Sequence, residues 1–247
     1  MKKITALVLL SSLWASALSA DWEGHTAWAG LTKLSSPLSG LVEQVLVMPG
    51  EEVAKGQLLL RMEQGVLRAR VAEAEATSHF ARLQQQETAK ELGRAEELYE
   101  RTLLADHELD LARIEAARGM AEYRSAQAEE RAAREALAHS ELRAPFAARV
   151  LSRHVVAGEA VVNRLYGMPM LVLAKSEQML VALSLPAQQM AGLAHGMSLA
   201  VEVAGERYPA TVQAISYDLS SGSYQVEVLF VPSRKMMAGM PARVRLP

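Results

Sequence analysis

The sulfur-containing side chains of this sequence are the ones best suited to binding a metal ion. The chain has 12 methionines and no cysteine, so a soft-metal site would use thioether ligands, which select ions such as Cu(I) and Ag(I). The tightest cluster is Met236, Met237 and Met240, and the next is Met168 with Met170. Because methionine commonly fills gaps in apolar cores, core packing is the favoured interpretation and a Cu(I) or Ag(I) site is the alternative.

Other reactive side chains are not arranged as a catalytic site. The six histidines lack the spacing of metal ligands. They are His25, His79, His107, His139, His154 and His195. The sequence contains no nucleophile elbow, no phosphate-binding glycine loop and no His-Glu-x-x-His motif, and the lack of cysteine excludes disulfides and thiolate chemistry. We therefore expect no enzyme, no cofactor and no histidine metal site.

A charged segment without proline, from about Gln64 to about Ser140, is predicted to form two antiparallel helices. In each limb a stripe of residues recurs at spacings of three and four, which is typical of a coiled-coil seam. The stripes hold Leu67, Val71, Ala74, Ser78, Ala81, Gln85, Thr88, Leu92, Ala95 and Tyr99, and then Leu109, Ala112, Ala116, Gly119, Tyr123, Ala126, Ala133 and Leu137. Limbs of roughly 35 to 40 residues would form a rod about 50 to 60 Å long, which is too long for the core of a compact domain.

Residues 1–20 are predicted to be a secretory signal peptide, because two lysines, an apolar run and small residues precede Asp21. Losing both lysines would change the formal net charge from −2 to −4. A mildly acidic chain of this kind does not have the excess of basic residues that is typical of proteins that bind nucleic acid or an anionic membrane. No later run approaches the roughly 20 apolar residues that span a bilayer, and no cysteine near the cleavage site could carry a lipid anchor. We expect an exported protein.

The segments on either side of the helical stretch repeat one pattern at an offset of 108 residues, which aligns Pro37 with Pro145. The other aligned pairs are Val42 and Val150, Val47 and Val155, Gly50 and Gly158, Glu51 and Glu159, and Val53 and Val161. Both segments are rich in β-branched residues and are predicted to be strands. Two half-modules of one design would therefore form a single β sandwich from which the helices project.

Glycines are expected to mark the turns of these half-modules, because glycine adopts positive φ without steric strain. The predicted structural turns are at Gly40, Gly50, Gly56 and Gly158. The repeat places Ala148 opposite Gly40, so we expect a strained or rebuilt turn at Ala148.

Several motifs in the two halves resemble a known family. They are Gly40, Pro49-Gly50-Glu51, Val53 and Gly56-Gln57 in the first half, and Arg143-Ala-Pro145-Phe146 and Gly158-Glu159 in the second. They are similar to a lipoyl/biotinyl-type domain split by a helical hairpin, as in the HlyD-like periplasmic adaptor subunits, also called membrane fusion proteins. The resemblance implies an elongated α+β fold. A lipoyl-like first half (residues 37–63), an antiparallel coiled-coil α-hairpin (64–140) and a second half (141–174) would follow in order.

Residues 175–247 alternate strands and turns, and the resemblance implies a β-barrel domain there. Strands are expected at Met179–Leu185, Leu199–Ala204, Tyr208–Tyr217 and Ser223–Val231. A short helix is expected from Pro186 to Gly196. Residues 21–36 should add one N-terminal strand, around Thr26–Leu34, to the barrel. Neither end has the residues for a full membrane-proximal domain, so we expect docking to a transporter through the barrel and lipoyl-like surfaces.

The family resemblance also implies a function for the tip of the hairpin. Tunnel-docking adaptors carry R-x-x-x-L-x-x-x-x-x-x-S around the helix-helix turn, and Arg94 and Leu98 match its first two positions. Ala105 stands at the serine position, and Asp106 is expected to cap the second helix in its place. The alternative is that Arg94 is merely solvated and Leu98 packs across the turn.

A lipoyl-like module also raises the possibility of a carrier with a modified lysine, but no lysine lies between Lys55 and Lys90. The resemblance implies instead a non-catalytic periplasmic adaptor, bound to the inner membrane through its transporter. Such an adaptor would form a homo-oligomer, with a hexamer suspected, and would bridge an inner-membrane efflux transporter to a TolC-type outer-membrane channel. A resistance-nodulation-division (RND) transporter is the first choice and an ABC exporter the second. The alternative function is a periplasmic chaperone that delivers Cu(I) or Ag(I).

Overall fold

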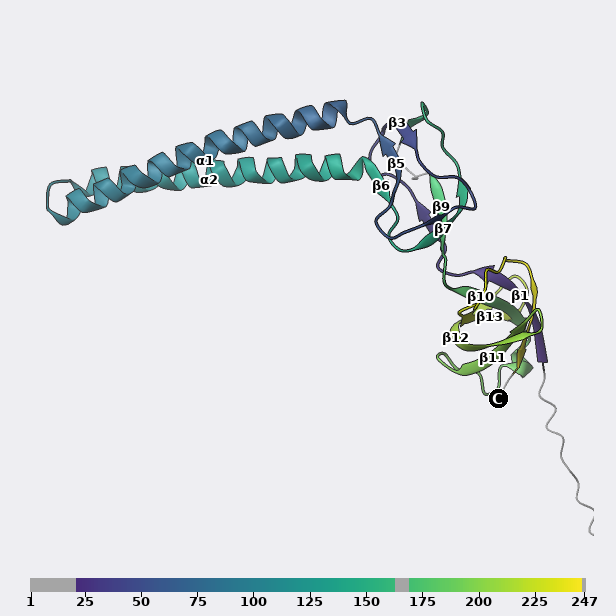
Figure 1. Ribbon diagram of the computed structural model, residues 1–247. Coiled ribbons are helices and arrows are strands. Elements are labelled where there is room, and N and C mark those ends of the chain that lie inside the picture. The colour runs from purple at the N-terminus through teal and green to yellow at the C-terminus, as the bar shows by residue number, and fades with distance from the viewer. Residues whose placement is uncertain (1–20, 163–168, 246–247) are drawn as a thin grey trace, which may run out of the picture. The chain divides into compact units, whose positions relative to one another are not determined.

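The computed structural model describes residues 21–162 and 169–245, and the chain divides into two compact units (Figure 1). One unit contains the described residues up to Ala29 together with those from Glu177 onward, and the other spans Gly30–Ser176. The predicted signal peptide, residues 1–20, lies outside the described ranges. Within those ranges no helix is long and apolar enough to cross a membrane.

The first unit is a closed antiparallel β-barrel. In order around the barrel, its strands are β1 (Asp21–Trp28), β10 (Met179–Leu185), β13 (Ser223–Phe230), β12 (Glu206–Asp218), β11 (Ser198–Val203) and β14 (Pro241–Arg245). Alternate residues point inward, as in β10, where Val181 and Leu183 are buried and Ala182 is exposed. Side chains from each of these strands form one apolar core.

Two local expectations for this part of the chain are wrong. The N-terminal segment forms two strands rather than one, since β1 pairs with β10 and β14 of the barrel whereas β2 (Thr32–Leu34) pairs with a sandwich strand. Gly30, with φ of +60°, lies between them and turns the chain from one unit to the other. The helix expected after Pro186 is only a 3-10 turn, η1 (Ala187–Gln189).

The second unit contains a sandwich of two four-stranded sheets. One sheet has the order β2, β9 (Leu171–Lys175), β7 (Ala148–Arg153) and β4 (Glu52–Val53), and the other has the order β6 (Glu141–Arg143), β5 (Leu58–Met62), β3 (Gly40–Val45) and β8 (Ala160–Val161). Each sheet therefore takes strands from before and after the helices. Val42 and Val150, which the repeat aligns, are both fully buried in the shared core.

Backbone hydrogen bonds show that the two halves interlock reciprocally. Gly50 N–H donates to the carbonyl of Val150 at 2.7 Å, and Gly158 N–H donates to that of Val42 at 2.8 Å. The two bonds join equivalent positions of the repeat, because Gly50 corresponds to Gly158 and Val150 to Val42. In the first bond the first half-module donates, and in the second bond the second half-module donates. The turns close alike as well, because the side chains of Glu51 and Glu159 each accept a bond from a backbone N–H three residues earlier, both at 3.0 Å.

Neither the turn expected at Gly40 nor the strained or rebuilt turn expected at Ala148 is present, because each residue opens a strand. Gly50, Gly56 and Gly158 have φ of +91°, +82° and +86°, but neither Gly40 nor Ala148 has positive φ. Gly40 opens β3 and Ala148 opens β7, where its side chain is fully buried. An added Cβ at position 40 would lie 3.2 Å from the terminal methyl of Met62, so a larger residue there would require that methyl to move by a few tenths of an ångström.

Two long helices stand between β5 and β6. They are α1 (Gly65–Glu100) and α2 (Asp106–His139), which run antiparallel and side by side (Figure 1). Their buried positions are mostly small, including Ser78, Ala81, Gly119 and Ala126, which allows the backbones to approach closely. The contact is close at Gly119, where an added Cβ would lie 2.6 Å from the Oγ1 of Thr88.

Candidate functional site

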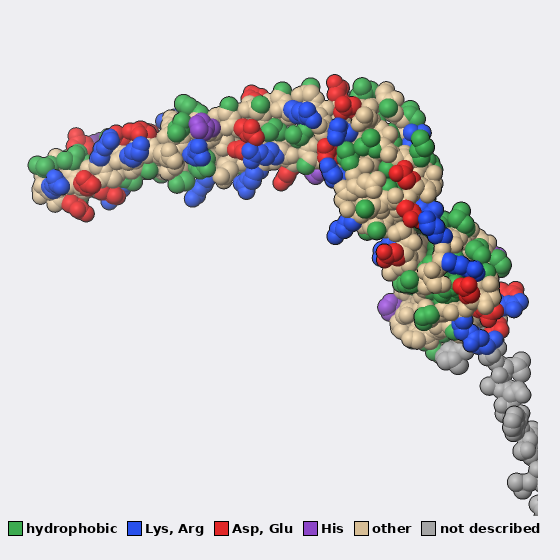
Figure 2. Space-filling model, viewed as in Figure 1, with side chains coloured by type: hydrophobic (Ala, Val, Ile, Leu, Met, Phe, Trp, Pro, Cys, Tyr) green, Lys and Arg blue, Asp and Glu red, His purple; other side chains and the backbone are tan. Residues whose placement is uncertain are grey.

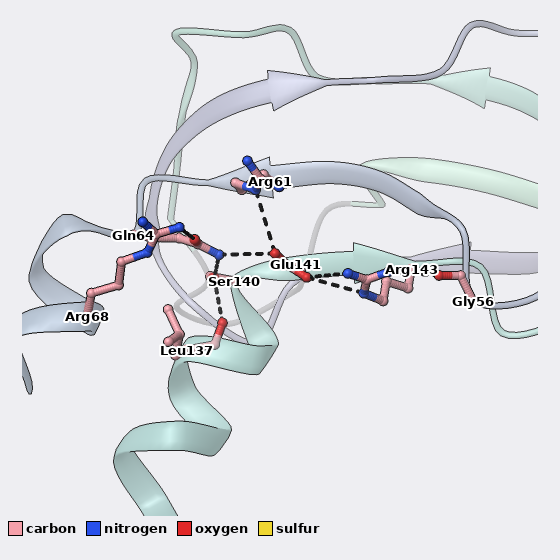
Figure 3. Close-up of polar contacts among 8 residues, drawn as sticks. All are labelled: Gly56, Arg61, Gln64, Arg68, Leu137, Ser140, Glu141 and Arg143. Carbon is pink, nitrogen blue, oxygen red and sulfur yellow. Dashed lines mark hydrogen bonds and ion pairs between the residues drawn. The ribbon is translucent and has the colours of Figure 1, made fainter. Parts of the chain in front are cut away.

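The base of the hairpin is held by a buried pair of polar side chains, Gln64 and Ser140 (Figure 3). Gln64 precedes α1 and Ser140 follows α2. The Nε2 of Gln64 donates to the Oγ of Ser140 at 2.8 Å, and that hydroxyl donates to the carbonyl of Leu137 at 2.5 Å. The N–H of Met62 also donates to the Ser140 carbonyl at 2.8 Å. These bonds hold the start of α1, the end of α2 and strand β5 together.

Charged side chains surround this pair. Glu141 accepts hydrogen bonds from Arg143 at 2.7 and 3.2 Å, and its other oxygen lies 3.6 Å from the Nε of Arg61. The bonds from Arg143 hold the pKa of Glu141 below its ordinary value, although partial burial opposes them. Arg143 also donates to the carbonyl of Gly56 at 2.9 Å. The base is therefore tied both to β6 and to a turn of the sandwich.

Ser140→Ala is expected to lower the free energy of unfolding by about 1 to 3 kcal/mol, because it leaves a buried amide without its main partner. Gln64 would keep only its 3.5 Å contact with Glu141 on that side. Ser125→Ala is the control, since Ser125 is exposed on α2. Urea unfolding of both variants measures the effect, and an equal change in the two would show that the buried pair contributes nothing.

The tip of the hairpin has the hydrogen bonds of a Schellman motif. Thr102 N–H donates to the Tyr99 carbonyl at 2.8 Å, and Leu103 N–H donates to the Leu98 carbonyl at 2.9 Å. An apolar contact between the residues at the positions of Leu98 and Leu103 commonly accompanies this motif. Glycine is usual at the left-handed position, but here Thr102 occupies it with φ of +59°. The sequence interpretation did not identify Leu103 or Thr102, because without a glycine the motif has only the five-residue spacing of two leucines as a signal.

The second helix does not begin as predicted. Asp106 is its first helical residue rather than its cap, because the extended residue before the helix is Ala105. Alanine has no side-chain acceptor, and Glu108 reaches back to the N–H of Ala105 at 3.5 Å. Asp106 instead accepts a hydrogen bond from the Tyr99 hydroxyl across the hairpin, which raises the pKa of Tyr99. Acidic residues in this first turn also offset the helix dipole.

The predicted tip residues lie in the last turns of α1 and at the start of α2. Arg94 and Leu98 are four residues apart and so share one side of α1. The guanidinium of Arg94 lies 2.6 Å from a carboxylate oxygen of Glu91, and the Arg94 side chain is 64% exposed. Leu98 is 42% exposed. The tip therefore presents an ion-paired arginine and a half-exposed leucine.

The described methionines serve mainly as packing residues. Met236 is buried in the barrel core, Met240 packs against that core and Met170 is buried in the sandwich core. Met237 is 63% exposed, and Met168 lies outside the described ranges. Among the described residues no group of three histidine, aspartate or glutamate side chains could hold a metal ion.

The sandwich identifies the family of this chain. The model of the CzcB-like barrel-sandwich hybrid domain matches residues 30–165, which is more than half of the sequence. The chain belongs to this family of membrane fusion proteins. Comparison with curated proteins gives no match. Proteins of the family are non-catalytic components of transport systems.

Solved membrane fusion proteins share the fold at low sequence identity. The structure of Spr0693 from Streptococcus pneumoniae R6, a membrane fusion protein, matches with a TM-score of 0.69 and 14% identity over 92% of this chain and 97% of that one. A MacA-MexA chimera with the Pseudomonas aeruginosa MexA α-hairpin domain matches with a TM-score of 0.67 and 15% identity, over 92% and 81% of the two chains. ZneB from Cupriavidus metallidurans matches with a TM-score of 0.52 and 18% identity, over 93% and 98%.

Proposed function

We propose that this membrane fusion protein is the periplasmic adaptor of an efflux system and joins an inner-membrane transporter to a TolC-type outer-membrane channel. The observation that carries the proposal is the hairpin of 36- and 34-residue helices inserted between the two halves of the family's domain. The likeness to the chimera with the MexA α-hairpin domain supports it. At about 1.5 Å per residue, these helices can carry a contact roughly 50 Å from the sandwich.

The adaptor would work by binding and holding rather than by chemistry. The two helices would pack as a coiled coil, the barrel and lipoyl-like surfaces would contact the transporter, and several copies, with six as the working number, would surround the transport path. An RND transporter is our first choice and an ABC exporter the second. We assign channel docking to the hairpin tip, with Arg94, Leu98, Ala105 and Asp106 within it.

Replacing Leu98 with aspartate tests this assignment. Leu98→Asp is expected to abolish efflux in a strain lacking the native gene, because a carboxylate in place of leucine would lose its hydration at an apolar contact. Leu83→Asp is the matched control, since Leu83 lies on the same helix, is 49% exposed and is far from the tip. Drug or metal susceptibility measures efflux, and immunoblotting and circular dichroism check export and folding. Full efflux by an exported Leu98→Asp chain would refute tip docking.

A further inference from the structure

The hairpin concentrates its negative charge toward its free end. Residues 87–115, which include the last turns of α1, the connecting turn and the first turns of α2, contain nine acidic and four basic side chains, a net charge of −5. The rest of the two helices, residues 65–86 and 116–139, contains six acidic and seven basic side chains, a net charge of +1. The same helical hairpin thus has a strongly acidic distal part and a nearly neutral proximal part.

Ion pairs within the helices use most of the positive charge in the distal part. Lys90 pairs with Glu87 at 3.2 Å, Arg94 with Glu91 at 2.6 Å, and Arg113 with Asp110 at 3.3 Å. Three exposed glutamates in the last two turns of α1 form no ion pair with any residue that the structure describes. They are Glu96, Glu97 and Glu100. Arg101, at the end of α1, is the fourth basic side chain of residues 87–115 and is exposed. A binding partner would still meet net negative charge over these residues, because nine acidic side chains outnumber four basic ones.

Large apolar side chains are exposed in the same distal part. Leu98 is 42% exposed, Leu103 70%, Leu111 50% and Ile114 61%. Leu98 and Leu103 occupy the apolar positions of the Schellman motif, while Leu111 and Ile114 are three residues apart and share one side of α2. Figure 2 shows apolar side chains at the free end of the hairpin with acidic side chains close to them. The proximal part also exposes Phe80 (66%) and Leu83 (49%). The distal part therefore differs by the negative charge that accompanies its exposed apolar side chains, since exposed apolar residues alone are ordinary.

We infer that the tip docks onto a protein surface that presents lysine and arginine side chains around apolar sockets. The inference rests on the proposed docking function and adds the chemistry of the partner. Complementary charge steers association and sets its specificity. The acidic tip would repel both an anionic membrane and the tip of a second copy, so neither fits it. A partner surface that binds Arg94 through its own carboxylates is also disfavoured, because the guanidinium of Arg94 already pairs with Glu91.

Photocrosslinking in the host cell tests the inference with the full-length chain. Leu103 is replaced by the photoreactive amino acid p-benzoylphenylalanine, and the crosslinked peptide of the partner is identified by mass spectrometry. The test chain also carries Glu96→Gln, Glu97→Gln and Glu100→Gln. The control chain carries Glu73→Gln, Glu129→Gln and Glu135→Gln, which remove the same charge from exposed, unpaired glutamates of the proximal part.

We expect the crosslink to map to a basic segment of the partner. We also expect its yield to fall roughly tenfold in the test chain and to stay within about twofold of the parent in the control. A crosslink to an acidic or neutral segment, to lipid or to a second copy would overturn the inference, as would equal yields in the two chains. Of these results, a crosslink to an acidic or neutral segment of another protein would overturn only the basic character of the partner, and the docking function of the tip would stand. The absence of any crosslink would overturn the inference, and its absence together with efflux by Leu98→Asp would overturn the docking function as well.

Discussion

Deletion of residues 64–140, with Glu63 joined to Glu141 through an Asn-Gly turn, is expected to give a chain that folds but exports nothing. Strands β5 and β6 are already antiparallel neighbours, with Arg61 opposite Glu141. Met62, Glu63 and the added Asn-Gly would then form a four-residue hairpin loop, which is a common length for such connections. Neither apolar core contains a residue of the helices. The deletion also removes Gln64 and Ser140 together, so neither buried group is left without its partner.

Urea unfolding, followed by hydrogen–deuterium exchange in the strands of the sandwich, measures whether the sandwich of the deleted chain still folds cooperatively. Tryptophan fluorescence would report on the barrel instead, because Trp22 and Trp28 both lie in β1. Circular dichroism measures the loss of helix. Efflux assays in the strain without the native gene should give the background level, because nothing then reaches the distant partner. A chain that unfolds without cooperativity would show that the hairpin is needed to hold the two halves together. Substantial efflux by the deleted chain would show that the hairpin is not the bridge.

Gly119→Leu is expected to weaken the hairpin by about 1 to 3 kcal/mol, the usual effect of overpacking a close contact. An added Cβ would meet the Oγ1 of Thr88 at 2.6 Å and the backbone Cα of Gln85 at 3.4 Å. Thr88 has little freedom to move away, since its hydroxyl donates to the Gln85 carbonyl at 3.0 Å. The helices would have to separate, and we expect the misaligned tip to lower efflux.

Gly93→Leu is the matched control for this prediction, because an added Cβ there has nothing within 4 Å. Leucine in place of glycine inside a helix, without a clash, should instead stabilise by roughly 0.5 to 1 kcal/mol. Thermal unfolding of the helical circular dichroism signal compares the two variants. If both changes had the same sign, the close contact at Gly119 would not limit the size of the side chain there.

The sequence repeat predicted the sandwich because residues at equivalent positions of the repeat also make equivalent contacts in the structure. Val42 and Val150 are equivalent in the repeat and in the core, and Gly50 and Gly158 donate the reciprocal bonds. The same alignment misled at Gly40, which opens β3 and does not have positive φ. Only the structure shows that its neighbour is the Met62 methyl.

The details of the tip and the base depend on contacts that helical periodicity does not specify. Helical periodicity placed the seam, but it does not show whether Ala105 or Asp106 precedes the first helical turn. Nor does it show that the hydroxyl of Tyr99 reaches across to the carboxylate of Asp106. Gln64 and Ser140 were expected only as approximate ends of the helical stretch, because a buried pair 76 residues apart leaves no local pattern.

Capture of the assembled complex tests the central claim most directly. The tagged full-length chain and its 64–140 deletion are purified from chemically crosslinked cells, and the proteins recovered are identified by mass spectrometry. We predict that the full-length chain recovers an inner-membrane transporter and an outer-membrane channel together, and that the deleted chain recovers the transporter alone. Recovery of the channel by the deleted chain, or of neither protein by the full-length chain, would contradict the account.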